Sequence, residues 1–307
     1  MAYDGFMEFV FARVLEPAGC VLYTIFLVFI VTSPDRRLRS PFYLLFVSIG
    51  ISSILTDLTT YLINLCWDLE LGPDYWTFIF LSQLVTGITF YAHNLGMILT
   101  AVDRFVNVRH IVSGSSFWNE RVAKWAILGH YVVAVACAAF FVRFEIAWRV
   151  TPDGRVVYNG LSKFMLTMCR IMEAGTCLLY VLIAIPLNIA VIVKMRNYTE
   201  NLALDTAHHT RQYRLLTWYS LFSTFAYLFI TVIECLWLVS ILDGDEAMVV
   251  WSRSHFPLAQ GIGLYSAPIF LLLLSASARG AITRFFPHKS YVFNSVSSGF
   301  SAERTVI

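Results

Sequence analysis

The sequence predicts an all-α integral membrane protein, folded as a bundle of seven transmembrane helices. Two observations lead to this fold class. First, 58% of the 307 residues are apolar and only 14% are charged, whereas a soluble domain carries roughly 25% charged residues. Second, long apolar runs alternate along the whole chain with short loops that hold most of the Lys and Arg. The net charge of +2 and the lack of a basic patch give no indication of nucleic-acid binding.

Seven stretches are long and apolar enough for a spanning helix, which needs about 20 residues. They cover residues 10–31, 42–66, 77–102, 121–142, 168–193, 215–241 and 255–279. Asp4 and Glu8 precede the first stretch in place of a basic segment, so we expect an uncleaved span and not a signal peptide. Basic and apolar residues alternate over 279–286, which predicts a short amphipathic helix on the membrane face. We expect residues 1–286 to form one domain and the Ser-rich residues 287–307 to form a disordered cytosolic tail.

The positions of Lys and Arg predict the orientation. With the N-terminus outside and the C-terminus in the cytosol, most of the 22 Lys and Arg lie in cytosolic loops, as the positive-inside rule requires. We therefore expect a multi-pass protein of the plasma membrane in contact with the lipid bilayer. The loop 143–167 is the basic exception on the outer side. Its Pro152-Asp153-Gly154 predicts a hairpin turn, which either covers the mouth of the bundle or extends into solvent.

The cysteines and the motifs give no indication of a metal site, a cofactor or an enzyme. None of the six cysteines forms a CxxC pair or lies at metal-ligand spacing from a histidine. No HExxH, GxSxG or phosphate-binding glycine loop occurs. Cys66 and Cys169 lie near predicted outer helix ends, where they either form a disulfide or remain two unpaired thiols.

The stretch LTAVDRFVNVRH (Leu99–His110) places Asp103-Arg104-Phe105 at the predicted inner end of span three. With three further motifs in the same order, the chain resembles the nematode serpentine chemoreceptors of the gamma superfamily (classes gamma and V), which are seven-transmembrane receptors of the G-protein-coupled type. These motifs are Pro41-Phe42-Tyr43, RQYRLLTWYSLF (Arg211–Phe222) and LLLLSASARGAITRFF (Leu271–Phe286).

That resemblance implies a small-molecule ligand in the outer half of the bundle and a heterotrimeric G protein as partner, with sensory cilia as one location. It also implies that Asp103, Arg104 and Phe105 form the G-protein switch. Arg104 is held by Asp103 at rest and meets the G protein when the helices part. A planar, permanently charged guanidinium suits such an exchange of partners. The alternative is a charged helix end that only obeys the positive-inside rule.

Ionisable residues inside spans are costly and indicate function. Asp57 lies in the middle of span two, and His93 and Asn94 lie in span three, so we expect these three to form a polar core. The resemblance to rhodopsin-like receptors implies a sodium site at Asp57. However, His93 occupies the position of the usual Ser, and Ser266–Phe270 lacks the Asn and Tyr of the NPxxY motif. A hydrogen-bonded pair of Asp57 with His93 or Asn94 is therefore favoured.

Glu173 and Glu234 fall in the outer halves of spans five and six. If both face inward, they form an acidic, aromatic-edged pocket that suits a basic or hydrogen-bonding ligand. The alternative is a structural pair of Arg170 with Glu173, one helical turn apart, and a Glu234 that extends to water. The predicted pocket comprises Tyr91, Arg170, Glu173, Glu234, Trp237 and Gln260.

Span six has no proline, so we expect the activation hinges at Pro186 in span five and Pro268 in span seven. Two other functions remain open. The first is a transporter or ligand-gated channel, and the second is a family member that does not signal. A conduit needs charged residues in a continuous inward-facing line, whereas a receptor needs an outer cluster and an inner switch divided by an apolar layer.

Overall fold

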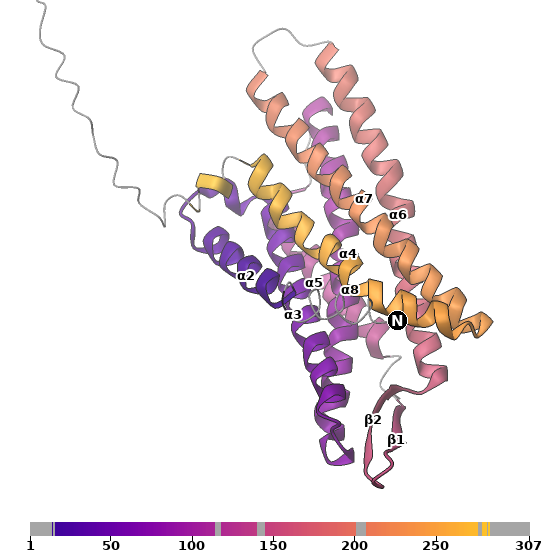
Figure 1. Ribbon diagram of the computed structural model, residues 1–307. Coiled ribbons are helices and arrows are strands. Elements are labelled where there is room, and N and C mark those ends of the chain that lie inside the picture. The colour runs from indigo at the N-terminus through magenta and orange to yellow at the C-terminus, as the bar shows by residue number, and fades with distance from the viewer. Residues whose placement is uncertain are drawn as a thin grey trace, which may run out of the picture.

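Long helices joined by short connections, with one β-hairpin, make up the computed structural model (Figure 1). The structure describes residues 14, 16–113, 118–139, 145–200, 207–275, 278–280 and 282. The α-helices are α2 (Glu16–Thr32), α3 (Pro41–Asp68), α4 (Trp76–Ser113), α5 (Glu120–Ala139), α6 (Lys163–Glu200), α7 (Ala207–Asp243) and α8 (Glu246–Leu274). Two 3-10 helices, η2 (Arg36–Arg39) and η3 (Pro73–Tyr75), precede α3 and α4.

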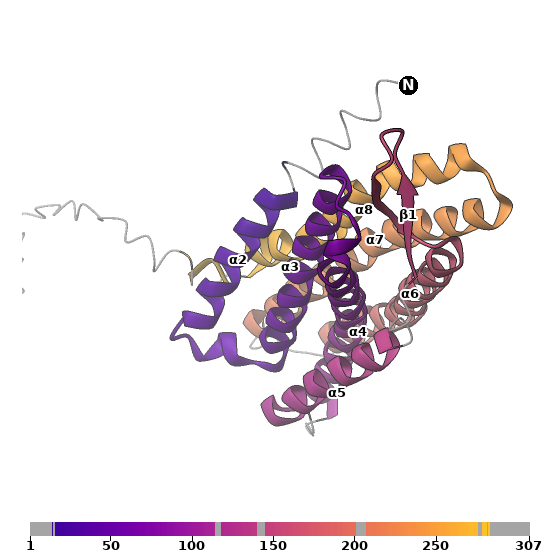
Figure 2. The ribbon, with the colours of Figure 1, turned by 90° about the horizontal axis from the view of Figure 1, so that it is seen from below.

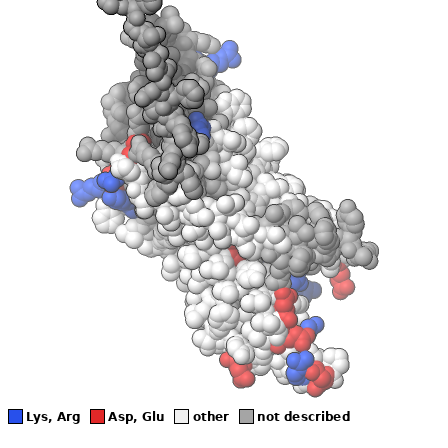
Figure 3. Space-filling view, turned by 60° about the vertical axis from the view of Figure 1, so that its left-hand side comes forward, with Lys and Arg blue, Asp and Glu red and all other residues white. Residues whose placement is uncertain are grey.

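The predicted seven-helix membrane fold is confirmed. Within the described residues, six helices are long and apolar enough to cross a membrane, and α2 is an apolar helix of 17 residues. On the face in Figure 3, charged side chains gather at two ends of the molecule and leave a broad, nearly uncharged band between them. This distribution fits a bundle whose middle lies in hydrocarbon.

Several helices extend beyond the predicted spans. Helix α4 continues to Ser113, so Asp103-Arg104-Phe105 lies inside a helix and not at its end. Helix α8 begins at Glu246, where the Asp245 side chain accepts a hydrogen bond from the Met248 amide (3.1 Å). Hydropathy marks only the segment that contacts hydrocarbon, whereas backbone hydrogen bonding continues into the aqueous region. Residues 278–280 are helical, and the rest of the predicted amphipathic helix and the tail 287–307 lie almost entirely outside the described residues.

Seen from below, α3 and α4 occupy the centre of the bundle, with α2 and α5 at its outside (Figure 2). Their backbones approach closely where a glycine faces a neighbouring helix. A Cβ atom on Gly96 of α4 would lie 2.5 Å from the Cγ1 atom of Ile49 on α3. A Cβ atom on Gly263 of α8 would lie 2.2 Å from the Cδ1 atom of Ile230 on α7. Small residues at such contacts let membrane helices pack tightly.

The predicted hairpin is confirmed as β1 (Ile146–Val150) paired antiparallel with β2 (Val156–Leu161). Gly154 turns the chain with φ of +82°, a left-handed conformation that glycine adopts without strain. In Figure 1 the hairpin lies at the bottom of the bundle, far from the joined ends of α6 and α7 at the top.

Two sets of contacts hold the hairpin against the bundle. The Tyr158 amide donates to the Leu71 carbonyl (2.8 Å), and the Gln83 side chain donates to the Tyr158 hydroxyl (2.8 Å). Arg149 and Arg155 both pair with Glu70 at 3.2 Å. The hairpin therefore covers the mouth of the bundle and does not extend freely into solvent.

Of the two alternatives for Cys66 and Cys169, the structure has the unpaired thiols and not the disulfide. All six cysteines lie in described residues, and their thiols are free. Cys66 packs with Ile79 and Tyr158 beneath the hairpin, whereas Cys169 belongs to a different apolar cluster around Tyr91. The two thiols were placed at the same membrane face by the sequence, but they are buried in separate parts of the bundle.

Close packing at Gly96 generates a test of the α3–α4 contact. Gly96→Ala should destabilise the purified protein by about 1–3 kcal/mol because the added methyl group overpacks Ile49. Thermal unfolding in detergent measures the change. Gly175→Ala is the matched control, since nothing lies within 4 Å of a Cβ atom there. Equal stability of the two variants would contradict this description of the interface.

Candidate functional site

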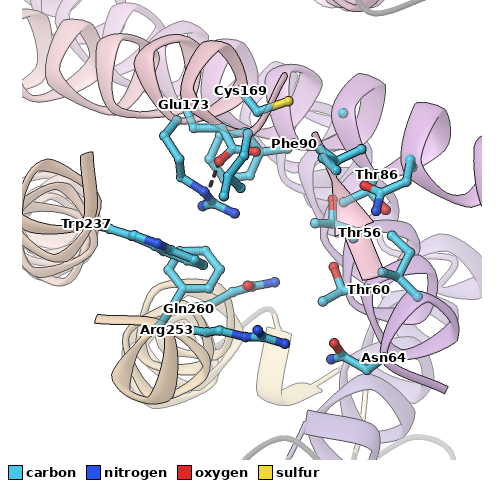
Figure 4. A pocket seen from close by; sticks show the side chains of 18 of the residues that line it. Thr56, Thr60, Asn64, Thr86, Phe90, Cys169, Glu173, Trp237, Arg253 and Gln260 are labelled. Atoms are coloured by element: carbon cyan, nitrogen blue, oxygen red, sulfur yellow. Dashed lines mark ion pairs between the residues drawn. The ribbon is translucent and has the colours of Figure 1, made fainter. Parts of the chain in front are cut away.

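A cavity of about 320 Å³ opens between the helices at the end of the bundle that the hairpin covers. Five of the six residues predicted for the pocket line it, namely Tyr91, Arg170, Glu173, Trp237 and Gln260. Helix α3 adds Thr56, Thr60 and Asn64, and Arg253 enters from α8 (Figure 4). Residues Tyr158 to Leu161 of β2 also line the cavity, so the hairpin forms part of its wall.

Arg170 is the charged centre of one end of the cavity. Its Nη1 atom lies 2.7 Å from Glu173 Oε2 and 3.0 Å from Glu234 Oε1. The guanidinium carbon lies 3.7 Å from the centre of the Trp237 ring. One cation on α6 thereby binds a carboxylate of its own helix and a carboxylate of α7, and an aromatic ring covers it.

The prediction that Glu234 lines the pocket is wrong, and so is the alternative that it extends to water. Its side chain is 0% exposed and it is absent from the cavity wall. A buried carboxylate needs a partner of opposite charge, and Arg170 supplies it. Since both carboxylates bind Arg170, this end of the cavity is less acidic than the sequence suggested.

Asp57 has different partners from those expected. The Gln260 side chain donates to Asp57 Oδ1 (2.9 Å), and the Tyr265 hydroxyl lies 2.5 Å from Asp57 Oδ2. The same hydroxyl lies 2.8 Å from the Glu16 carbonyl. Asp57 thus joins α3 to α8 and, through Tyr265, to α2. Because Gln260 also lines the cavity, this network lies directly behind the cavity wall.

His93 and Asn94 belong to a second network. The His93 ring pairs with the Ser53 hydroxyl (2.7 Å) and stacks on Tyr227 with ring centres 5.4 Å apart. Asn94 donates to Thr176 (3.1 Å) and accepts from the Tyr227 hydroxyl (2.8 Å). The predicted polar core is therefore divided, because Asp57 faces α8 while His93 and Asn94 face α3, α6 and α7.

Asp103 and Arg104 are both buried within α4, 0% and 5% exposed. The Trp118 indole donates to Asp103 Oδ1 (2.6 Å), which ties α4 to the segment before α5. The Arg104 guanidinium lies on the Phe42 ring, 3.7 Å from its centre, with Tyr219 at 5.8 Å. Arg104 is therefore covered by aromatic rings of α3 and α7.

Phe105 faces another side of α4. Lys194 Nζ lies 4.6 Å from the centre of its ring, and Phe105 packs beside an apolar cluster of Val108, Val191 and Met195. The three residues of the motif thus contact different neighbours: Asp103 the segment before α5, Arg104 helices α3 and α7, and Phe105 helix α6.

Buried apolar residues of α4 lie between the cavity and Arg104. Tyr91 and Arg104 are 13 residues apart on α4, which is about 20 Å along a helix axis. Between them, Met97 and Ala101 are buried in an apolar cluster that includes Ile230 of α7.

The prolines predicted as hinges lie inside continuous helices, Pro186 in α6 and Pro268 in α8.

Arg253 was missed by the sequence analysis because it precedes the predicted start of span seven. Helix α8 begins earlier, and Arg253, Pro257 and Gln260 then fall at helical spacing i, i+4 and i+7. That spacing places them on one face, and all three line the cavity. In the sequence, the helical spacing between Arg253 and Gln260 is the feature that would have placed Arg253 in the predicted pocket.

Comparison with known families gives one result that covers most of the chain. The family model described as "Serpentine type 7TM GPCR chemoreceptor Srv" matches residues 18–287. That description is of a receptor family and not of an enzyme family. No curated protein matches the sequence.

The Arg170 cluster generates a stability test. Arg170→Met should destabilise the protein by about 3–5 kcal/mol because it leaves two buried carboxylates without a counter-ion. Adding Glu234→Gln should restore part of this loss, and thermal unfolding in detergent measures both variants. Arg149→Met, which breaks only the exposed pair with Glu70, should cost at most about 1 kcal/mol. A double variant no more stable than Arg170→Met would contradict the assignment.

Proposed function

The chain belongs to the Srv family of serpentine seven-transmembrane chemoreceptors, and on that premise we propose that it is a G-protein-coupled receptor for a small molecule. The ligand binds in the cavity lined by Arg170, Trp237 and Gln260, and a heterotrimeric G protein binds at the end of the bundle that holds Arg104. The cavity end faces outward and the C-terminus faces the cytosol. The protein works in the plasma membrane of a nematode chemosensory cell, with sensory cilia as its expected location.

One observation carries this proposal, namely that buried apolar side chains lie between a small-molecule cavity and a buried arginine. The cavity of about 320 Å³ has the size of a site for a small ligand. Met97 and Ala101 lie between the cavity and Arg104 on the same helix. In the proposed receptor, the signal passes from the cavity to Arg104 through movement of the helices.

Arg104 is proposed as the switch because of what covers it. Phe42 on α3 and Tyr219 on α7 hold the guanidinium. When α3, α4 and α7 part, the guanidinium becomes accessible and its planar fork can donate to backbone carbonyls of the G protein. Ligand binding shifts the population towards that open state. Pro186 and Pro268 supply positions at which α6 and α8 can bend.

The placement of the ionisable residues favours a receptor over a transporter or channel. Asp57 is bound by Gln260 and Tyr265, and Glu234 is bound by Arg170. These groups join helices to one another and do not form a continuous line through the membrane. A conduit would need such a line.

The switch is tested by G-protein activation in cells that express the wild type or Arg104→Ala, screened against small metabolites. Arg104→Ala should lower the ligand-evoked response at least about tenfold, which corresponds to a coupling free energy of about 1.4 kcal/mol, while ligand binding is retained. Arg109→Ala is the control, because Arg109 is an exposed residue of the same helix.

Surface expression of each variant is measured alongside the response. An undiminished response from Arg104→Ala would contradict the switch assignment. A ligand-gated current that requires no G protein would instead support the channel.

A further inference from the structure

The cavity wall offers buried hydrogen-bond donors that nothing in the described structure uses. The indole Nε1 of Trp237 and the Nε atom of Arg170 lie on residues of the wall, and neither has a hydrogen-bond partner within the described residues. Trp237 is only 7% exposed, and its ring points into the cavity (Figure 4). A buried donor without an acceptor is unfavourable, so an acceptor atom of a ligand would complete this end of the site.

The other end of the cavity carries Arg253. Figure 4 shows its side chain extending from α8 towards Thr60 and Asn64 of α3. The guanidinium carbon lies 4.9 Å from the centre of the Trp67 ring. In the part of the chain that the structure describes, no carboxylate lies within ion-pair distance of Arg253. By contrast, Arg149, which also lies over Trp67 (6.0 Å), pairs with Glu70.

An arginine supported on an aromatic ring keeps its N–H groups available at the edge of the guanidinium plane. That fork matches the two oxygens of a carboxylate. Asn64 beside it adds a neutral amide. The ring face fixes the position of the guanidinium, so less side-chain freedom is lost when an anion binds.

We propose that the cavity binds a small organic acid. Arg253 holds the carboxylate, the apolar body lies between Phe90 and Phe256, and an acceptor at the far end of the molecule binds Trp237 Nε1. This inference rests on the proposed function, since it names the ligand class of the same cavity.

The wall carboxylates do not favour the basic ligand that the sequence suggested. Glu173 is bound by Arg170 at 2.7 Å. Glu16, the other carboxylate of the wall, also has a partner within the structure. A ligand amine would have to compete for groups already engaged, whereas an acid meets a guanidinium that pairs with no carboxylate of the described residues.

The test uses the purified full-length protein in lipid nanodiscs and three probes that share one ring and chain. The probes are hydroxyphenylpropanoate, its primary amide and the corresponding amine, within a wider set of small acids, amides and amines. Binding is measured by equilibrium dialysis and by the shift in thermal unfolding. We expect acids to bind more tightly than their amides and amines.

Arginine substitutions then identify the side chain that binds the carboxylate of the acid. Arg253→Gln should weaken binding of the acids about tenfold to hundredfold, with little effect on amides. Arg253→Lys, which keeps the charge and loses the fork, should give an intermediate affinity. Arg149→Gln is the matched control, because it removes an equal charge beside Trp67 but outside the cavity, and acid affinity should change less than about threefold.

Trp237→Phe tests the far end of the site. It keeps an aromatic ring on Arg170 and removes the donor, so it should weaken hydroxyphenylpropanoate about threefold to tenfold. The affinity of phenylpropanoate, which has no hydroxyl group, should be unchanged.

The proposal is overturned if no acid in the set binds, if amines bind more tightly than acids, or if Arg253→Gln binds acids as the wild type does. Arg253-dependent binding of acids without any G-protein response would leave this inference standing and remove the proposed signalling function. A G-protein response to amines or neutral compounds alone would support the proposed signalling function and overturn the inference that the ligand is an acid.

Discussion

The buried contact of Arg170 with Glu173 and Glu234 is the interaction on which the cavity end of the bundle depends. Charges inside a membrane bundle are tolerated only when they are paired. Because the two carboxylates come from α6 and α7, the pairing fixes how these helices are rotated against each other. That rotation presents Trp237 to Arg170 and so sets one wall of the cavity. Sliding or rotating α7 would separate Glu234 from its only described counter-ion.

A second constraint connects the cavity to the rest of the molecule. Gln260 lines the cavity and also binds Asp57, so one side chain belongs to both the binding surface and the α2–α3–α8 contact. Arg170 likewise lines the cavity and joins α6 to α7 through Glu234. The cavity is therefore built from the same polar side chains that hold the helices together, and a ligand that displaces one of them changes helix packing directly.

At the opposite end of the bundle, aromatic rings cover the buried Arg104. Phe42 and Tyr219 cover Arg104, and they belong to an apolar cluster that joins α2, α3, α7 and α8. The two buried arginines thus have different surroundings, since Arg170 pairs with two carboxylates and Arg104 lies against two aromatic rings.

The sequence by itself determined the helices, the hairpin and five residues of the cavity wall. A stretch of about 20 apolar residues has to span the membrane whatever its neighbours are, and Pro152-Asp153-Gly154 turns the chain locally. Ionisable residues in such spans identified Arg170 and Glu173 as members of one site. Only the tertiary structure decided the partners: Gln260 and Tyr265 for Asp57, Arg170 for Glu234, and no disulfide for Cys66. The physical reason is that helices apolar on every side carry no clear hydrophobic face. Their rotation, and with it the inward position of Arg253, is fixed only when all the helices pack together.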